Sequence, residues 1–135
     1  MPFSLAIQTP TEPVFEGEVE SLLAPGTEGY LGVLAHHAPL ITGLKPGQLE
    51  LTLPDGVVQG YFITGGFLEV SQNRAIVLAD ALEPVDALDE AAARQELEQL
   101  RAAKPSASDV AVAEQEISRA RARLHVAQRQ RGDRH

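Results

Sequence analysis

Two adjacent histidines, His36 and His37, are the first candidates for a chemical role, because the chain of 135 residues has only four histidines and no cysteine. Imidazole groups act as metal ligands and as general acids or bases near neutral pH. Adjacent side chains of an extended segment point to opposite faces, however, and no nearby Asp, Glu or Cys completes a ligand set. The pattern therefore favours a connecting loop, in which Pro39 keeps Ala38 out of the helical region, over a metal or catalytic site.

Three carboxylates occupy alternate positions, at Glu16, Glu18 and Glu20. On one β-strand this spacing places them on a single face, where they could bind calcium or exchange protons. A sheet must also show a polar face to water, and this second explanation is favoured. The sequence has neither a Gly-x-Ser-x-Gly nucleophile elbow nor a Gly-x-x-x-x-Gly-Lys phosphate loop. We therefore expect no catalytic residue and no metal site.

Basic side chains gather near the C-terminal end. Residues 1–85 hold ten acidic and two basic side chains, whereas residues 117–135 hold six arginines and one acidic residue. Arg119 and Arg123 are four residues apart and share a helix face, so they could clamp a phosphate or a carboxylate-rich surface. Spacing alone favours the alternative, a solvated helix face that contributes to solubility.

The composition excludes several classes of protein. A formal net charge of −8 argues against general nucleic-acid binding. The absence of cysteine excludes disulfides, thiol catalysis and cysteine-ligated zinc. No apolar run approaches the ~20 residues of a membrane span, and the first residues lack the pattern of a signal peptide.

Residues 1–85 read as short strands broken by turns. They contain ten of the eleven glycines and eight of the nine prolines. Hydrophobic residues alternate with polar ones from Phe3 to Ile7 and from Leu49 to Leu53, as in half-buried strands. Pro54-Asp55-Gly56 supplies turn chemistry, and turn signals recur about every 8–12 residues. This spacing predicts an antiparallel β-sandwich or flattened barrel of about ten strands.

Residues 86–135 read as a separate helical domain. Strong helix formers predict helices over about 87–103 and 109–130, with Asp86 as the first N-cap and a connector at 104–108 that contains Pro105. Small and apolar residues recur at spacings of three and four in both helices, which predicts an antiparallel two-helix hairpin. The expected seam positions are Ala93, Leu97, Leu100, Ala103, Val110, Ala113, Ile117, Ala120, Leu124 and Ala127.

Two long motifs resemble a known family. The run from Gly29 to Gly47 fits the pattern Gly-x-x-Gly-(Ile/Val)-x-x-x-His-Ala-Pro-Leu-(Leu/Val)-Thr followed by Leu-x-Pro-Gly. The run from Gly65 to Val70, with Val77-Leu78-Ala79-Asp80 after it, fits Gly-Gly-x-x-Glu-Val and Leu-Ala-Asp. Both patterns are similar to those of the epsilon subunit of F-type ATP synthases, and the resemblance covers essentially the whole chain in the right order.

This resemblance implies a function without catalysis. Such a subunit lies in the central stalk, where its β-sandwich binds the gamma subunit and rests on the c-ring. Its C-terminal helices extend into the alpha/beta catalytic head and inhibit ATP hydrolysis. The complex would place it, as a peripheral protein, at the cytoplasmic face of a bacterial plasma membrane, a location favoured over a plastid. The partner-binding candidates are Tyr30, His36, His37, Pro39, Arg119, Arg121, Arg123 and Arg129.

Some members of this family bind ATP through the motif (Ile/Leu)-Asp-x-x-Arg-Ala. The corresponding run here starts at Leu88 and has Ala92 in place of the arginine. Asp89, Arg119 and Arg123 are the remaining candidates for nucleotide contacts, but the alanine disfavours binding, so no cofactor is expected. The alternatives are a nucleotide-sensing form of the same subunit, an unrelated non-catalytic β-sandwich adaptor, or a hydrolase that uses His37 and a carboxylate.

Overall fold

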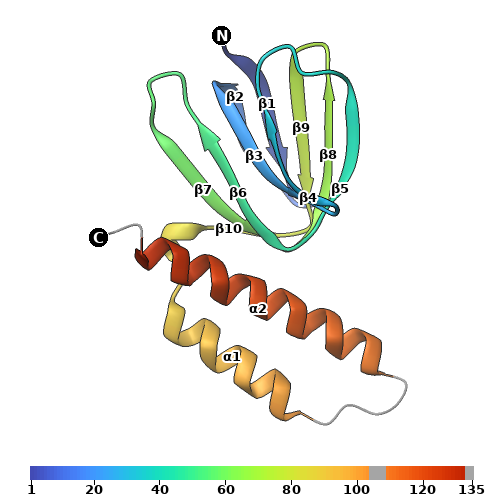
Figure 1. The fold of residues 1–135 in the computed structure, drawn as a ribbon, viewed down its shortest axis with the longest axis vertical. Helices are drawn as coiled ribbons and strands as arrows, with labels where there is room; N and C mark the ends of the chain where they lie inside the picture. Colours follow the sequence, from blue (N-terminus) through green and yellow to red (C-terminus); the bar gives the residue numbers. More distant parts are fainter. Residues whose placement is uncertain (104–108, 133–135) are drawn as a thin grey trace. The chain divides into compact units, whose positions relative to one another are not determined.

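The computed structural model describes residues 1–103 and 109–132. The chain divides into two units, Met1–Pro84 and Val85–His135, which are described separately. The first unit is built of ten strands and the second of a short 3-10 helix and two α-helices (Figure 1). The predicted connector at 104–108 lies outside the described residues.

The ten strands of the first unit form one continuous hydrogen-bonded sheet, which curls round on itself (Figure 1). Its strand order is β10-β7-β6-β3-β5-β8-β9-β1-β2, with β4 paired to β3. The strands are β1 (Phe3–Gln8), β2 (Pro13–Val19), β3 (Ser21–Gly26), β4 (Gly29–Val33), β5 (Leu40–Leu44), β6 (Gly47–Thr52), β7 (Val58–Ile63), β8 (Gly66–Ser71), β9 (Arg74–Ala79) and β10 (Leu82–Pro84).

The predicted flattened barrel is confirmed, with one pairing that the sequence did not indicate. Neighbouring strands pair antiparallel except β1 and β9, which run parallel with Leu5 opposite Ala75. Short turns fix antiparallel pairs locally, whereas this parallel pair joins segments about seventy residues apart. Nothing in the local pattern of either strand specifies such a partner.

The core lies inside the curl and follows the two-residue period of the strands. Phe3, Leu5 and Ile7 are buried on β1, and Leu49 and Leu51 are buried on β6, as their alternation predicted. Leucine, isoleucine, valine and phenylalanine side chains from most of the strands complete one cluster. At ~25 cal/mol per Å² of apolar surface removed from water, this cluster supplies the main stabilisation of the unit.

Two turns of the sheet have left-handed residues, and the first lies where Pro54-Asp55-Gly56 predicted a turn. Gly56, with φ of +93°, follows Asp55, whose carboxylate accepts a hydrogen bond from the Val57 N–H at 3.0 Å. Gln72 and Asn73, with φ of +50° and +59°, join β8 to β9. Two successive positive φ angles match the twist of a tight hairpin, and asparagine tolerates them better than most residues.

The second unit contains η1 (Val85–Ala87), α1 (Glu90–Ala102) and α2 (Val110–Gly132). The predicted starts at residues 87 and 109 and the predicted ends at 103 and 130 are shifted by one to three residues. Asp86 lies in η1 and is not the N-cap; Asp89 takes that role, and its carboxylate accepts from the Ala91 N–H at 2.9 Å. The two acidic residues fit an N-cap equally well by type, and the 3-10 turn decides between them.

The two α-helices run antiparallel and pack side by side (Figure 1). Their buried residues include Ala93 and Leu97 on α1 and Ala120 and Ala127 on α2, all at predicted seam positions. Ala103 and Val110, by contrast, are exposed, because they lie at helix ends beyond the paired region. Val126 is buried although the seam did not include it, since α2 also packs against η1 and its buried stripe widens.

The close contact between β8 and β9 predicts that a larger residue in place of Gly66 destabilises the fold. Its φ of +148° is rarely adopted by other residues, and a Cβ there would overlap the Leu78 carbonyl oxygen. We expect Gly66→Ala to lower the free energy of unfolding by about 3 kcal/mol, measured by urea denaturation, from backbone strain plus overpacking. Gly32→Ala is the matched control, because a Cβ at this exposed position meets nothing within 4 Å. An equal effect of the two substitutions would contradict the steric explanation.

Candidate partner-binding surfaces

The described residues contain no group of three or more His, Cys, Asp or Glu side chains that could hold a metal ion. Glu16 and Glu18 are exposed on β2, on the face turned away from the core. Glu20, expected on the same strand face, lies after the end of β2, and its carboxylate pairs with the amino group of Met1 at 3.3 Å. The three carboxylates therefore do not form the predicted single row.

The two histidines lie in the loop between β4 and β5, as predicted, and their surroundings differ. His36 is exposed and has a φ of +63°; its backbone N–H donates to the Asn73 side-chain oxygen at 2.8 Å. His37 is half-buried, and its Nδ1–H donates to the Ala38 carbonyl at 2.7 Å. Pro39 is exposed at the end of the loop. One ring nitrogen of His37 is thus used to shape the loop itself.

Tyr30 and His37 border the same shallow depression of about 340 Å³ on the first unit. The Tyr30 hydroxyl accepts a hydrogen bond from the Gln48 backbone N–H at 3.0 Å, which holds the ring over Gly47. A Cβ at Gly47 would lie 2.9 Å from that hydroxyl and 2.8 Å from Pro25, so only glycine fits beneath the ring. The other lining residues are Gly26, Glu28, Gly29, Leu31, Leu40 and Thr42.

An exposed apolar patch lies on neighbouring strands β5, β8 and β9. Its members are Ile41, Phe67 and Leu78, whose surfaces are 75%, 61% and 50% exposed. Phe67 lies directly opposite Leu78 in the register, and β5 pairs with the other side of β8. We call these three residues the outer apolar patch; large hydrophobic groups on one sheet face are typical of binding surfaces.

The outer apolar patch was not predicted from the sequence, although the sequence contains a signal for it. Phe67 and Leu68 are adjacent on one strand, so only one of them can face the core. Leu68 is fully buried, and Phe67 is consequently turned outward. The same reasoning applies to Val77 and Leu78 on β9. The register that brings Phe67 and Leu78 together comes only from the folded sheet.

The four arginines proposed as partner contacts lie on α2. Arg119, Arg121 and Arg129 are exposed, whereas Arg123 is half-buried and its Nη1 donates to a carboxylate oxygen of Glu96 on α1 at 2.9 Å. At 100° per residue, Arg119 and Arg123 share a face and Arg121 projects from another. The structure therefore pairs Arg123 with α1, whereas the other three arginines are distributed around α2.

Asp89 and Ala92, the positions of the nucleotide motif, both lie at the start of α1. The Asp89 carboxylate accepts hydrogen bonds from the backbone N–H groups of Ala91 and Ala92 at 2.9 and 3.3 Å. Arg94, two positions after Ala92, pairs with Glu90 at 3.0 Å along the same helix. Asp89 thus acts as a helix cap, and the side chain at position 92 is an exposed methyl group.

Among the described residues, neither helix combines the length and the apolar character needed to cross a bilayer.

Comparisons with known proteins give a consistent result. The family model "ATP synthase, Delta/Epsilon chain, beta-sandwich domain" matches residues 2–85. An ATP synthase epsilon chain of Herpetosiphon aurantiacus is 42% identical over 97% of this chain and 98% of the relative. The epsilon chain of Chromohalobacter salexigens is 40% identical over 98% and 97%.

Solved structures of ATP synthases contain chains with the same fold. A chain in the structure of the Euglena gracilis mitochondrial ATP synthase superposes with a TM-score of 0.78 at 22% identity, over 99% of this chain and 82% of that one. At this identity the likeness concerns the fold. Together with the match over the sheet unit and the full-length relatives, it makes the chain a member of the ATP synthase epsilon family, whose members are non-catalytic subunits.

Proposed function

We propose that the chain is a rotor subunit in the central stalk of an F-type ATP synthase, with one unit for docking and one for regulation. The first unit binds the gamma subunit and the c-ring and so helps to couple proton flow to ATP synthesis. The helical unit inhibits ATP hydrolysis in the alpha/beta head. Membership of the epsilon family supports this role, and the outer apolar patch is the observation that carries the docking part.

Gamma is the proposed occupant of the outer apolar patch. Ile41, Phe67 and Leu78 are each at least half exposed, and covering them removes apolar surface from water at about 25 cal/mol per Å². The strands beneath are held by continuous pairing from β5 to β9, so the patch is rigid before binding and little ordering entropy opposes association. The depression bordered by Tyr30 and His37 is more polar, which suits the polar loops of the c-ring.

We propose that the helical unit acts when α1 and α2 separate from each other. Among the described residues of this unit, three of the six buried hydrophobic side chains are alanines, which bury less apolar surface than leucine or isoleucine and hold α1 and α2 together less firmly. The Arg123–Glu96 pair is partly exposed, so it contributes only about 0.5 kcal/mol. Arg119, Arg121, Arg123 and Arg129 would then meet an acidic surface of the head, with Arg123 exchanging Glu96 for a new carboxylate.

We further propose that this regulation proceeds without nucleotide sensing. Ala92 offers no charge to a phosphate, and the Asp89 carboxylate is engaged at the helix N-terminus. The proposed location is the cytoplasmic face of a bacterial plasma membrane, where the subunit is peripheral.

The docking proposal predicts that Phe67→Asn weakens gamma binding. Loss of a buried aromatic contact of ~1.5–3 kcal/mol raises the Kd for gamma about 10- to 100-fold, measured by calorimetry with a gamma-containing catalytic head. Val58→Asn is the control, because Val58 is 56% exposed on β7, away from the outer apolar patch. Both variants are expected to keep the unfolding midpoint of the parent. Equal affinities of the Phe67 variant and the parent would refute this docking face.

The regulatory proposal predicts different effects of the full chain and of residues 1–85 on ATP hydrolysis. A catalytic head that contains gamma but lacks this subunit is mixed with either protein, and the rate of hydrolysis is measured. We expect both proteins to bind and only the full chain to inhibit, because residues 1–84 have their own core. Inhibition by residues 1–85 alone would show that the helices are not the inhibitory element. Failure of both proteins to bind would refute the rotor assignment.

The proposed absence of nucleotide sensing predicts that the chain does not bind ATP. Titration of the full chain with Mg-ATP in a calorimeter is expected to give no micromolar binding, because a phosphate-binding cation is missing at position 92. Ala92→Arg is the matched variant, since it restores the motif at an exposed helix position. Micromolar binding by the parent chain would favour the nucleotide-sensing alternative.

A further inference from the structure

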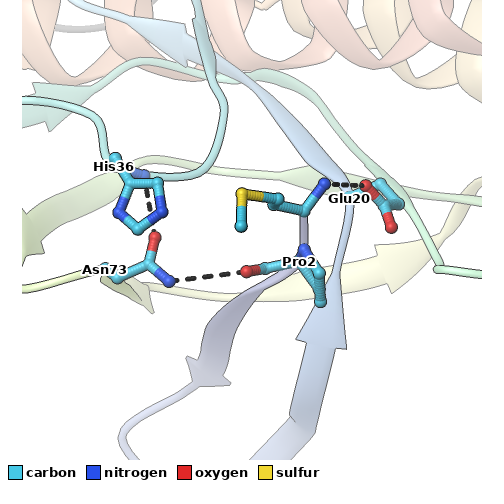
Figure 2. A network of polar contacts seen from close by, with 5 residues as sticks. Pro2, Glu20, His36 and Asn73 are labelled. Carbon is cyan, nitrogen blue, oxygen red and sulfur yellow. Dashed lines mark hydrogen bonds and ion pairs between the residues drawn. The ribbon is translucent and has the colours of Figure 1, made fainter.

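Asn73 joins three segments of the first unit that are distant in the sequence. Its side-chain oxygen accepts from the His36 backbone N–H at 2.8 Å, and its side-chain amide donates to the Pro2 carbonyl at 3.4 Å. Figure 2 shows the Asn73 amide between His36 and Pro2, with one side-chain atom turned to each. Its own carbonyl accepts from the Ser4 N–H at 3.3 Å. A single side chain thus connects the histidine loop to the start of β1.

Position 73 has two requirements that asparagine meets together. Its backbone is left-handed, with φ of +59°, and asparagine enters this region more readily than other residues with a side chain. Its side chain also offers an acceptor and a donor on separate atoms without carrying a charge, as a carboxamide does. Glycine would satisfy the backbone alone, and aspartate the backbone and the acceptor.

The contact to His36 fixes an unfavourable backbone conformation. His36 has a φ of +63° without being glycine, a region that residues with a side chain adopt uncommonly, so a hydrogen bond from outside the loop stabilises this bend. The His37 N–H, which donates to the Leu34 carbonyl at 3.2 Å, closes the turn from within. The hydrogen bond from the His36 N–H to Asn73 holds the turn against the rest of the sheet.

The same contact lies at the end of the strands that carry the outer apolar patch. The histidine loop leads directly into β5 at Leu40, which pairs with Val70 on β8. The turn that contains Asn73 follows β8 at Ser71 and leads into β9. The loop and the turn therefore close one end of β5, β8 and β9, and the His36–Asn73 hydrogen bond ties the two together.

We propose that Asn73 is a positioning residue for partner docking: it presets the exposed His36 side of the histidine loop, which leads into β5 next to Ile41 of the outer apolar patch, so that gamma meets a preformed surface at this end of the patch. His37, on the other side of the loop, borders the depression proposed for the c-ring. The inference rests on the proposed docking of gamma. Loss of the side chain leaves the loop in its binding conformation for only part of the time, and the apparent affinity falls by that fraction.

The test compares Asn73→Gly, Asn73→Asp and Gln72→Gly in the full chain. Glycine keeps the left-handed backbone of the turn, so the β8–β9 hairpin folds, but it removes the acceptor for His36. Aspartate keeps that acceptor. Gln72→Gly makes the same kind of change at the neighbouring exposed position, where φ is +50°. The readouts are the exchange rate of the His36 amide in the isolated protein and the Kd for a gamma-containing catalytic head.

Asn73→Gly is expected to speed exchange of the His36 amide and to raise the Kd for gamma, each about five- to tenfold, the factor that one hydrogen bond contributes. Asn73→Asp and Gln72→Gly should stay within about twofold of the parent in both. Unchanged His36 exchange or unchanged Kd in Asn73→Gly, with the parent binding gamma, overturns the positioning role and leaves the proposed function standing. Failure of the parent to bind gamma refutes the proposed function itself, and the docking role of Asn73 with it.

Discussion

The alternation of side chains along a β-strand is the constraint on which the first unit depends. Each side chain that enters the core obliges its neighbour to face outward. Leu68 and Val77 are fully buried, and this fixes Phe67 and Leu78 on the opposite face of β8 and β9. The outer apolar patch is therefore determined by the same periodicity that builds the core, and a shift of one residue in register would exchange the two faces.

Each of the two units is stabilised internally by a different kind of interaction. The sheet encloses a cluster of large aliphatic side chains, and hydrogen bonds between strands run through all ten strands. The buried residues of the helices are three alanines with Leu97 and Val126, among the described residues, and a partly exposed ion pair joins Arg123 to Glu96. A sequence rich in helix formers can keep its helices when the contacts between them open, and this property supports the proposed regulatory role.

Local features of the fold follow from the sequence, and long-range ones do not. The turn at Asp55-Gly56 and the loop around His36 were predicted, because each depends on the residues that form it. The parallel pairing of β1 with β9 and the role of Asn73 join segments far apart in the chain, and no local pattern encodes them. The start of α1 was misplaced because two aspartates, both suited to capping, stand three residues apart.

The two edge strands at the ends of the strand order also affect the tendency of copies of this chain to aggregate. β2 and β10 are those ends, and an unpaired strand edge offers its N–H and C=O groups to any other strand. β2 begins at Pro13 and carries Glu16 and Glu18 outward, and β10 is only three residues long and ends at Pro84. Proline removes a donor, and like charges repel when two such edges approach. The glutamates that resembled a binding site thus hinder edge-to-edge aggregation.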